Sequence, residues 1–344
     1  MTTKRKKKMS ARRRRHRRNR ILFTILICAG IIGCCALAFF QLKKGHDLDL
    51  SHSYLETYVF SETEEVTAQM KAQPFALDLC VTSGDVPSDT ITLNRNEKGA
   101  LFDIDDKKVV FGEDMFEKVY PASITKIMTA ILAVKYGNMD DVVTITQEDV
   151  TLEEGSQMVG FQAGDTVTMD ELFHGLLVYS GNDCAMAIAR HIGGTVEQFV
   201  AMMNEEVRSI GATGTHFVSP HGLHDENHYT TVYDIYLMLN EAITYPYFVE
   251  TMQLGNYIIT YTRGEETLTA RLDATDHYLT GEESAPAGVT VLGGKTGTTS
   301  AAGSCLAILS QNRYGEPFVS IVMKAVNKIT LYSDMNKLLS EINS

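Results

Sequence analysis

A serine and a lysine three residues apart, Ser123 and Lys126, are the pair whose types and spacing most clearly suggest chemistry. Pro121 precedes them and suits the first turn of a helix, because its missing N–H has no partner there in any case. An apolar run continues to Val134, so the pattern predicts a buried helix with the hydroxyl and the amine on one face. A serine becomes a nucleophile when a neighbouring group accepts its proton. Ser123 and Lys126 are therefore candidates for the catalytic nucleophile and base.

A second polar motif is Ser180-Gly181-Asn182, which lies in a short break between two predicted helices. It would direct a hydroxyl and an amide from a rigid turn toward a neighbouring site. The alternative interpretation is a helix cap, in which the same side chains bind free backbone N–H groups. A Ser-x-Asn is about as frequent by chance as a Ser-x-x-Lys, roughly one in a chain of this length. The motif therefore supports a functional interpretation only in combination with the other motifs of the sequence.

The rarer motif is Lys295-Thr296-Gly297-Thr298, which follows an apolar segment and Gly293-Gly294. By average composition it is expected in well under roughly one chain in ten of this size. A glycine in or beside a strand permits close approach by another backbone or a ligand. A glycine-rich surface turn is the competing interpretation.

Apolar periodicity predicts the elements that must position these motifs. Predicted strands cover residues 75–82, 90–93, 100–104, 108–111, 257–262, 268–272, 289–292, 303–309 and 318–323. Predicted helices follow Ser123 and cover residues 169–179, 183–192, 196–210, 231–243 and 331–342. Strands at both ends with helices between them predict one catalytic unit, residues 74–344, folded from both ends inward.

The N-terminal charge distribution predicts a membrane anchor. Residues 1–20 hold 12 of the 31 Lys and Arg and none of the 43 acids, so residues 21–344 carry 19 bases against 43 acids, a net charge of −24. Residues 21–40 are apolar or small and uncharged, long enough to cross a bilayer as a helix. We assign residues 1–20 to a basic cytoplasmic arm, 21–41 to a transmembrane helix and 42–73 to an extracytoplasmic stalk. We expect the basic arm to orient the transmembrane helix and to contact anionic lipid, and not to bind nucleic acid.

Cleavage or lipidation at Cys34 is the alternative to an uncleaved anchor. Apolar residues continue beyond Cys34 to Phe40, and no clear Ala-x-Ala site is present, which favours the anchor. The remaining cysteines do not indicate a disulfide framework, because three follow the predicted span and none forms a C-x-x-C motif. Cys184, beside the second motif, is interpreted as a small buried residue.

The three motifs in this order, with the residues around them, closely resemble the serine D-alanyl-D-alanine carboxypeptidases, which are low-molecular-mass penicillin-binding proteins. The resemblance extends over roughly residues 75–339 and includes the loop that contains Pro220-His221-Gly222-Leu223. It implies a mixed α and β fold, in which helices flank an antiparallel sheet and a mostly helical subdomain lies beside it. It also implies an active site between these two parts.

The resemblance implies a role for each motif residue. Ser123 would attack the penultimate carbonyl of a peptidoglycan stem peptide, and a neutral Lys126 would accept its proton. Ser180 would return the proton to the leaving D-alanine, and β-lactams would acylate Ser123. Substrate binding would fall to Asn182, Lys295, Thr296, Gly297 and Thr298. No cofactor or metal is implied.

Several alternatives stay open or are disfavoured by specific residues. A D,D-endopeptidase that cuts cross-links would use the same site. A class A β-lactamase would need a deacylating glutamate, but residues 210–219 contain no acid. A β-lactam sensor would need a cytosolic output domain, which 20 basic residues do not form. A zinc peptidase built on the histidines of residues 216–228 is disfavoured, because their spacing matches no common zinc motif.

One departure from the family concerns the cationic side chain that binds the terminal carboxylate of the substrate. Many members place an arginine on the last strand, but residues 322–328 here contain only Lys324 and Lys328 as cations. An ammonium lacks the bidentate fork of arginine. Either lysine is a candidate substitute.

Overall fold

The computed structural model describes residues 76–343. Its centre is a five-stranded antiparallel sheet in the order β2-β1-β9-β8-β7. The strands are β1 (Lys98–Asp103), β2 (Lys108–Glu113), β7 (Thr290–Thr299), β8 (Gly303–Gln311) and β9 (Pro317–Ala325). β1 pairs along its whole length with β9, although more than 200 residues separate them in the chain. This pairing joins strands from the two ends of the described chain in one sheet.

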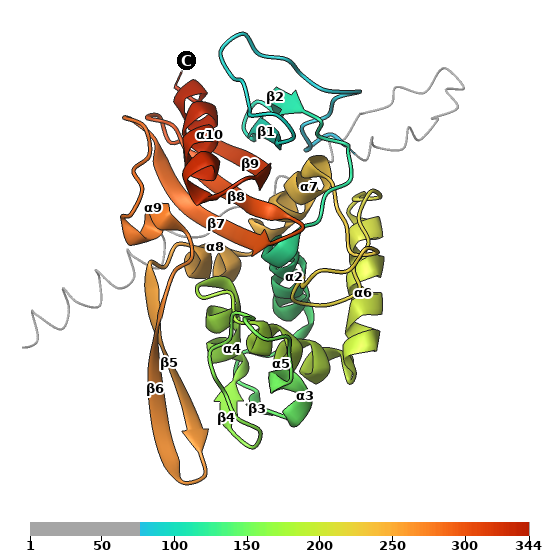
Figure 1. The fold of residues 1–344 in the computed structure, drawn as a ribbon, viewed down its shortest axis with the longest axis vertical. Coiled ribbons are helices and arrows are strands. Elements are labelled where there is room, and N and C mark those ends of the chain that lie inside the picture. The colour runs from blue at the N-terminus through green and yellow to red at the C-terminus, as the bar shows by residue number, and fades with distance from the viewer. Residues whose placement is uncertain (1–75, 344) are drawn as a thin grey trace, which may run out of the picture. The chain divides into compact units, whose positions relative to one another are not determined.

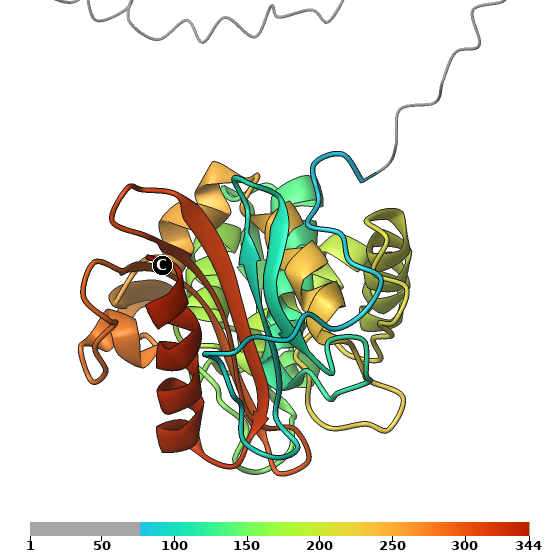
Figure 2. The same ribbon diagram turned by 90° about the horizontal axis from the view of Figure 1, so that it is seen from above.

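Helices cover both faces of this sheet. On one face, α10 (Lys328–Glu341) packs against Leu306, Ile308 and Val322, while Ala307 and Ile321 join the larger core on the other face. This division follows from the strand pleat, which directs successive side chains to opposite faces. Figure 2 shows α10 on one side of the sheet, with the short orange α9 segment (His277–Thr280) beside it, and most of the other helices on the opposite side.

The helical region between the strand segments holds most of the larger core (Figure 1). Its helices are α2 (Lys126–Tyr136), α3 (Gln147–Val150), α4 (Met169–Leu177), α5 (Asn182–Gly193), α6 (Val196–Ser209), α7 (Val232–Ala242) and α8 (Pro246–Met252). The long predicted helices are all present, with α4 to α7 within two residues of their expected ends and α10 beginning three residues earlier than expected. Thr168, Thr195 and Thr231 each accept a backbone N–H and so cap α4, α6 and α7.

A second antiparallel sheet lies beside the helices in the order β3-β4-β5-β6. Its strands are β3 (Val142–Thr144), β4 (Thr166–Thr168), β5 (Asn256–Arg263) and β6 (Glu266–Asp273). β5 and β6 form the long ribbon in Figure 1 and lead into the short helix α9 (His277–Thr280). The sequence predicted the ribbon but not β3 or β4, because three residues are too few to show alternation.

Two predicted strands are wrong. Neither the described part of residues 75–82 nor residues 90–93 forms a strand. The backbone of Cys80 is instead held by side chains: its N–H donates to the Tyr236 hydroxyl at 2.8 Å, and its carbonyl accepts from the Tyr233 hydroxyl at 2.8 Å. Ile91 and Leu93 alternate like a strand because both are buried, but they pack in the cluster beneath α10 without ladder pairing.

The predicted basic arm, residues 1–20, the predicted anchor, residues 21–41, and the predicted stalk, residues 42–73, lie outside the described residues. Within residues 76–343, no helix combines the length and apolar composition needed to cross a membrane.

Candidate active site

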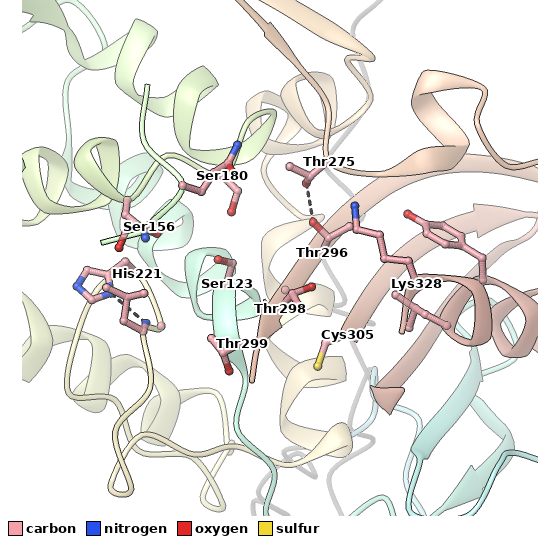
Figure 3. A pocket seen from close by; sticks show the side chains of 18 residues that line it. Ser123, Ser156, Ser180, His221, Thr275, Thr296, Thr298, Thr299, Cys305 and Lys328 are labelled. Carbon is pink, nitrogen blue, oxygen red and sulfur yellow. Dashed lines mark hydrogen bonds between the residues drawn. The ribbon is translucent and has the colours of Figure 1, made fainter. Parts of the chain in front are cut away.

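The three sequence motifs meet at one cavity of about 320 Å³ between the five-stranded sheet and the helical region (Figure 3). It is lined by Ser123, Ser180, Asn182, Thr296, Gly297 and Thr298 from the motifs. Other contributors are Gly155, Ser156, Gln157, His221, Gly222, Leu223, Thr275, Thr299, Cys305, Lys328, Leu331 and Tyr332. The two predicted lysines, Lys126 and Lys295, lie directly behind this lining and are fully buried.

Ser123 lies in a single 3-10 turn, Ala122–Thr125, and α2 continues from Lys126. A tight first turn is common where a helix begins, and it keeps the predicted side-chain pairing, because Lys126 Nζ lies 2.9 Å from Ser123 Oγ. Ala122 has φ of +49°, an unfavourable region for a residue with a Cβ. Such strain is typical of functional sites.

Two glycines allow other backbone segments to approach this turn. A Cβ at Gly222 would lie 1.9 Å from the Ala122 carbonyl oxygen. A Cβ at Gly297 would lie 3.0 Å from the Ser123 nitrogen and 3.1 Å from the Ile124 nitrogen. β7 therefore runs directly beside the backbone of Ser123, the close approach that a glycine in the third motif permits.

Lys126 has three polar neighbours at hydrogen-bond distance. Its Nζ lies 2.7 Å from Asn182 Oδ1, 3.1 Å from the His221 carbonyl oxygen and 2.9 Å from Ser123 Oγ. The first two can only accept, whereas a hydroxyl can also donate. An ammonium satisfies these three oxygens with three N–H donors, and a neutral amine satisfies them with two N–H donors and a lone pair that accepts the Ser123 proton.

Electrostatics favour the same neutral state. Complete burial lowers the pKa of Lys126 well below its usual value, and the nearby charge of Lys295 lowers it further. Burial also lowers the pKa of Lys295, to about 7, against a raising effect of Asp276. Desolvation and a like charge both disfavour the ammonium form.

Ser180 and Gly181 of the second motif lie in the predicted break, and Asn182 is the first residue of α5. Ser180 has φ of +67° and is buried, so its backbone is held in an unfavourable left-handed conformation. The adjacent Asp183 accepts the N–H groups of Val159 and Gly160 at 3.1 and 3.0 Å. These bonds tie the loop before residue 160 to α5, which places Ser156 and Gln157 at the cavity.

The third motif lies within β7, not after a strand as the sequence suggested. Apolar periodicity ends at Leu292, but pairing with β8 continues to Thr299. Hydrogen bonding to a neighbouring strand does not depend on side-chain polarity, which explains the difference. The Thr296 hydroxyl lies 2.6 Å from that of Thr275, and Figure 3 shows both at the cavity.

The sequence did not single out several residues of the cavity. Thr275 and Tyr332 lie in segments without any motif, and only the fold brings them to the site.

Of the two candidate lysines, Lys328 lines the cavity from the start of α10, whereas Lys324 is exposed and lines two other hollows. Figure 3 shows the Lys328 side chain extending from its helix toward Thr296.

The histidines of residues 216–228 have the structural role that the sequence favoured. His228 Nε2 lies 2.8 Å from Thr125 Oγ1, and the His221 carbonyl accepts from Lys126. Burial lowers the pKa of His221 to about 3 and that of His228 to about 4. In the described part of the chain, no group of three or more metal-binding side chains is placed to hold an ion. Cys184 is fully buried, as expected.

The mixed α and β fold and the serine–lysine site define a penicillin-binding-protein-like serine hydrolase. The model of the D-alanyl-D-alanine carboxypeptidase family, peptidase family S11, matches residues 94–327. The chain belongs to this family.

Individual relatives agree with the family assignment. D-alanyl-D-alanine carboxypeptidase DacF of Bacillus subtilis is 33% identical over 154 residues, which cover 43% of this chain and 39% of that protein. DacC of Escherichia coli is 28% identical over 249 residues, covering 70% and 59% of the two chains. The crystal structure of D-alanyl-D-alanine carboxypeptidase from Mycobacterium tuberculosis is 26% identical, with a TM-score of 0.65 over 75% of this chain and 93% of that one. The matched segments thus span about two fifths to three fifths of these curated relatives.

Proposed function

We propose that this protein is a serine D,D-carboxypeptidase that removes the terminal D-alanine from peptidoglycan stem peptides through an acyl-enzyme on Ser123. The observation that carries the proposal is the environment of Lys126, a fully buried amine that lies 2.9 Å from the Ser123 hydroxyl and whose pKa burial lowers well below its usual value. A serine with a neutral amine at this distance can attack a carbonyl, because the amine accepts the proton that the hydroxyl must lose.

The reaction proceeds in two halves. Ser123 Oγ bonds to the penultimate carbonyl carbon while its proton passes to Lys126 Nζ. The backbone N–H groups of Ser123 and Thr298 stabilise the oxyanion. The C–N bond then breaks, and Ser180 delivers a proton to the amine of the departing D-alanine. Water hydrolyses the ester and regenerates the hydroxyl, whereas a penicillin that acylates Ser123 leaves slowly.

Within the substrate-binding set, each residue has a distinct task. Asn182 orients Lys126 through its amide oxygen and leaves its NH₂ group for the peptide. Burial is the main cause that lowers the pKa of Lys126, and the nearby charge of Lys295 lowers it further. Thr296 and Thr298 present hydroxyls along the edge of the cavity. Gly297 has no side chain, so β7 can lie close to the backbone of Ser123.

The direct test is the release of D-alanine from a pentapeptide ending in D-Ala-D-Ala by the full-length protein in detergent micelles. We expect free D-alanine and covalent labelling by a fluorescent penicillin. Cleavage of cross-linked dimers with little D-alanine from the pentapeptide would show the endopeptidase alternative instead. Absence of both products and of labelling would refute a serine D,D-peptidase.

A class A β-lactamase is disfavoured by the lining of the site. Among the described residues that line the cavity, none is an aspartate or glutamate. A deacylating water therefore has no carboxylate base of the kind that class A enzymes use. We expect the penicillin acyl-enzyme to persist rather than turn over rapidly.

Recognition of the free terminal carboxylate gives a further prediction. Lys328 is the one lysine or arginine among the described lining residues, and its Nζ lies 3.1 Å from His277 Nε2. We expect Lys328→Met to lower kcat/KM for the free-acid peptide by roughly tenfold or more, because a charged hydrogen bond is lost. The matched control is Lys324→Met, which lies outside the cavity and should behave as wild type. A larger loss with Lys324→Met would reverse the assignment.

We further propose that residues 21–41 anchor the enzyme in the cell membrane with its catalytic unit outside. The stalk, residues 42–73, would reach at most on the order of 100 Å when extended, so the enzyme would act on wall close to the membrane. Deleting residues 1–44 should give a protein that no longer sediments with membranes but still releases D-alanine. External protease should cut the full-length protein in intact cells. Protection in whole cells with cleavage in inverted vesicles would contradict this topology.

A further inference from the structure

The lysine that lines the cavity is held by a side chain that the mechanism has not used. Lys328 Nζ donates a hydrogen bond to His277 Nε2 at 3.1 Å. The lysine is exposed and has a flexible four-carbon stem, so without a partner its ammonium would sample many positions. His277 itself is not among the described residues that line the cavity. It therefore contacts the cation and not the space that a substrate would fill.

The ring of His277 is fixed by two contacts with Tyr332. The two rings stack almost parallel, with 4.8 Å between their centroids and 10° between their planes. The backbone N–H of His277 also donates to the Tyr332 hydroxyl at 2.8 Å. Tyr332 is buried and lines the cavity, and it shares a face of α10 with Lys328, four positions before it. The imidazole is thus a rigid acceptor beside a flexible donor.

The direction of the hydrogen bond follows from the two groups. An ammonium can only donate, so Nε2 of His277 accepts, and the imidazole is neutral with its proton on Nδ1. A Glu282 oxygen lies 3.5 Å from the same nitrogen, which is longer than an ordinary N–H···O hydrogen bond. An ammonium has three N–H donors. The bond to His277 therefore leaves two of them for the two oxygens of a carboxylate.

We propose that His277 is a positioning residue that holds Lys328 Nζ at the cavity and thereby makes the enzyme selective for peptides with a free C-terminal carboxylate. The proposal rests on the proposed function, because it concerns how the same site recognises the end of its substrate. His277 touches neither the substrate nor the reacting atoms. Its loss should weaken binding of the carboxylate and leave the chemistry at Ser123 intact.

The test compares two pentapeptides that differ only at the C-terminus, one a free acid and the other a carboxamide. The full-length protein converts both to the same tetrapeptide, which mass spectrometry quantifies. His277→Phe keeps a ring to stack on Tyr332 but has no acceptor. We expect it to lower the ratio of kcat/KM for the acid over the amide roughly three- to tenfold, as for the loss of one hydrogen bond. The change should appear in KM for the acid, with kcat and the amide reaction near wild type.

Two further histidine variants test the hydrogen bond itself. His277→Leu also lacks an acceptor and should give the same loss, so the test does not depend on how the larger phenylalanine fits. His277→Gln offers an amide oxygen to the ammonium and should recover part of the ratio. The matched control is His174→Phe, because His174 stacks on Tyr257 at 4.0 Å and 13° but lies outside the described cavity lining. It should keep the wild-type ratio.

A double variant separates positioning from a general structural effect. Lys328→Met should lower the ratio by itself, and adding His277→Phe should lower it no further, because no ammonium remains to be held. Independent losses that add in the double variant would overturn the proposal.

Two other results would also overturn it: an unchanged ratio in both His277→Phe and His277→Leu, or an equal loss for the acid and the amide, which would assign His277 a purely structural role. Failure of the wild-type protein to shorten the free-acid peptide would instead refute the proposed function, so the two failures are distinguishable.

Discussion

Ser123→Ala should abolish covalent labelling by penicillin. The side-chain oxygen is the only atom proposed to bond to the substrate, and in the structure it lies 2.9 Å from the amine of Lys126. Without it, the site retains its cavity and its lysines but cannot form an acyl-enzyme. The measurement is fluorescent labelling of the full-length protein, followed by mass spectrometry of the labelled peptide.

The matched control for this prediction is Ser300→Ala, in the turn between β7 and β8 and outside the cavity lining. It should be labelled at the wild-type rate. Unfolding should occur at the same temperature in Ser123→Ala and wild type, because a hydroxyl is the only group removed. Labelling of another serine in the Ser123→Ala protein would show that the nucleophile has been assigned wrongly.

Lys126→Arg should lower the acylation rate by at least two orders of magnitude. A guanidinium keeps a positive charge but does not release its proton in proteins, so it cannot act as the base. Loss of a general base typically costs about 10²–10⁴ in rate. The matched control is Lys135→Arg on the same helix, where the lysine lies outside the cavity lining and forms an ion pair with the buried Glu206. A near-normal rate for Lys126→Arg would identify another base.

The pH dependence of the wild type follows from the same lysine. Only neutral Lys126 accepts a proton, so acylation should fall as the pH drops through its pKa. Burial and the charge of Lys295 place that pKa well below its usual value. The acid limb of the rate profile should therefore lie at a pH far below the pKa of a free lysine. A limb near pH 10 would show that Lys126 remains an ammonium at neutral pH.

The sequence alone was sufficient to locate most of the helices and strands and the residues of the three motifs. Apolar alternation located the hairpin of β1 and β2, and helical periodicity located α4 to α7, because burial of one face has the same period as the element itself. The Ser-x-x-Lys spacing also gave the contact between Ser123 and Lys126, since three residues on a helix span one turn. Local geometry was sufficient for these conclusions.

The tertiary structure decided everything that depends on distance between remote segments. Asn182 and the His221 carbonyl reach Lys126 from separate loops, and no spacing in the sequence predicts that meeting. The choice of Lys328 over Lys324 as the cation at the cavity was likewise open until α10 was placed. Burial and electrostatic proximity arise only when the chain is folded, and these two quantities, rather than residue type, lower the pKa of Lys126 well below that of an exposed lysine.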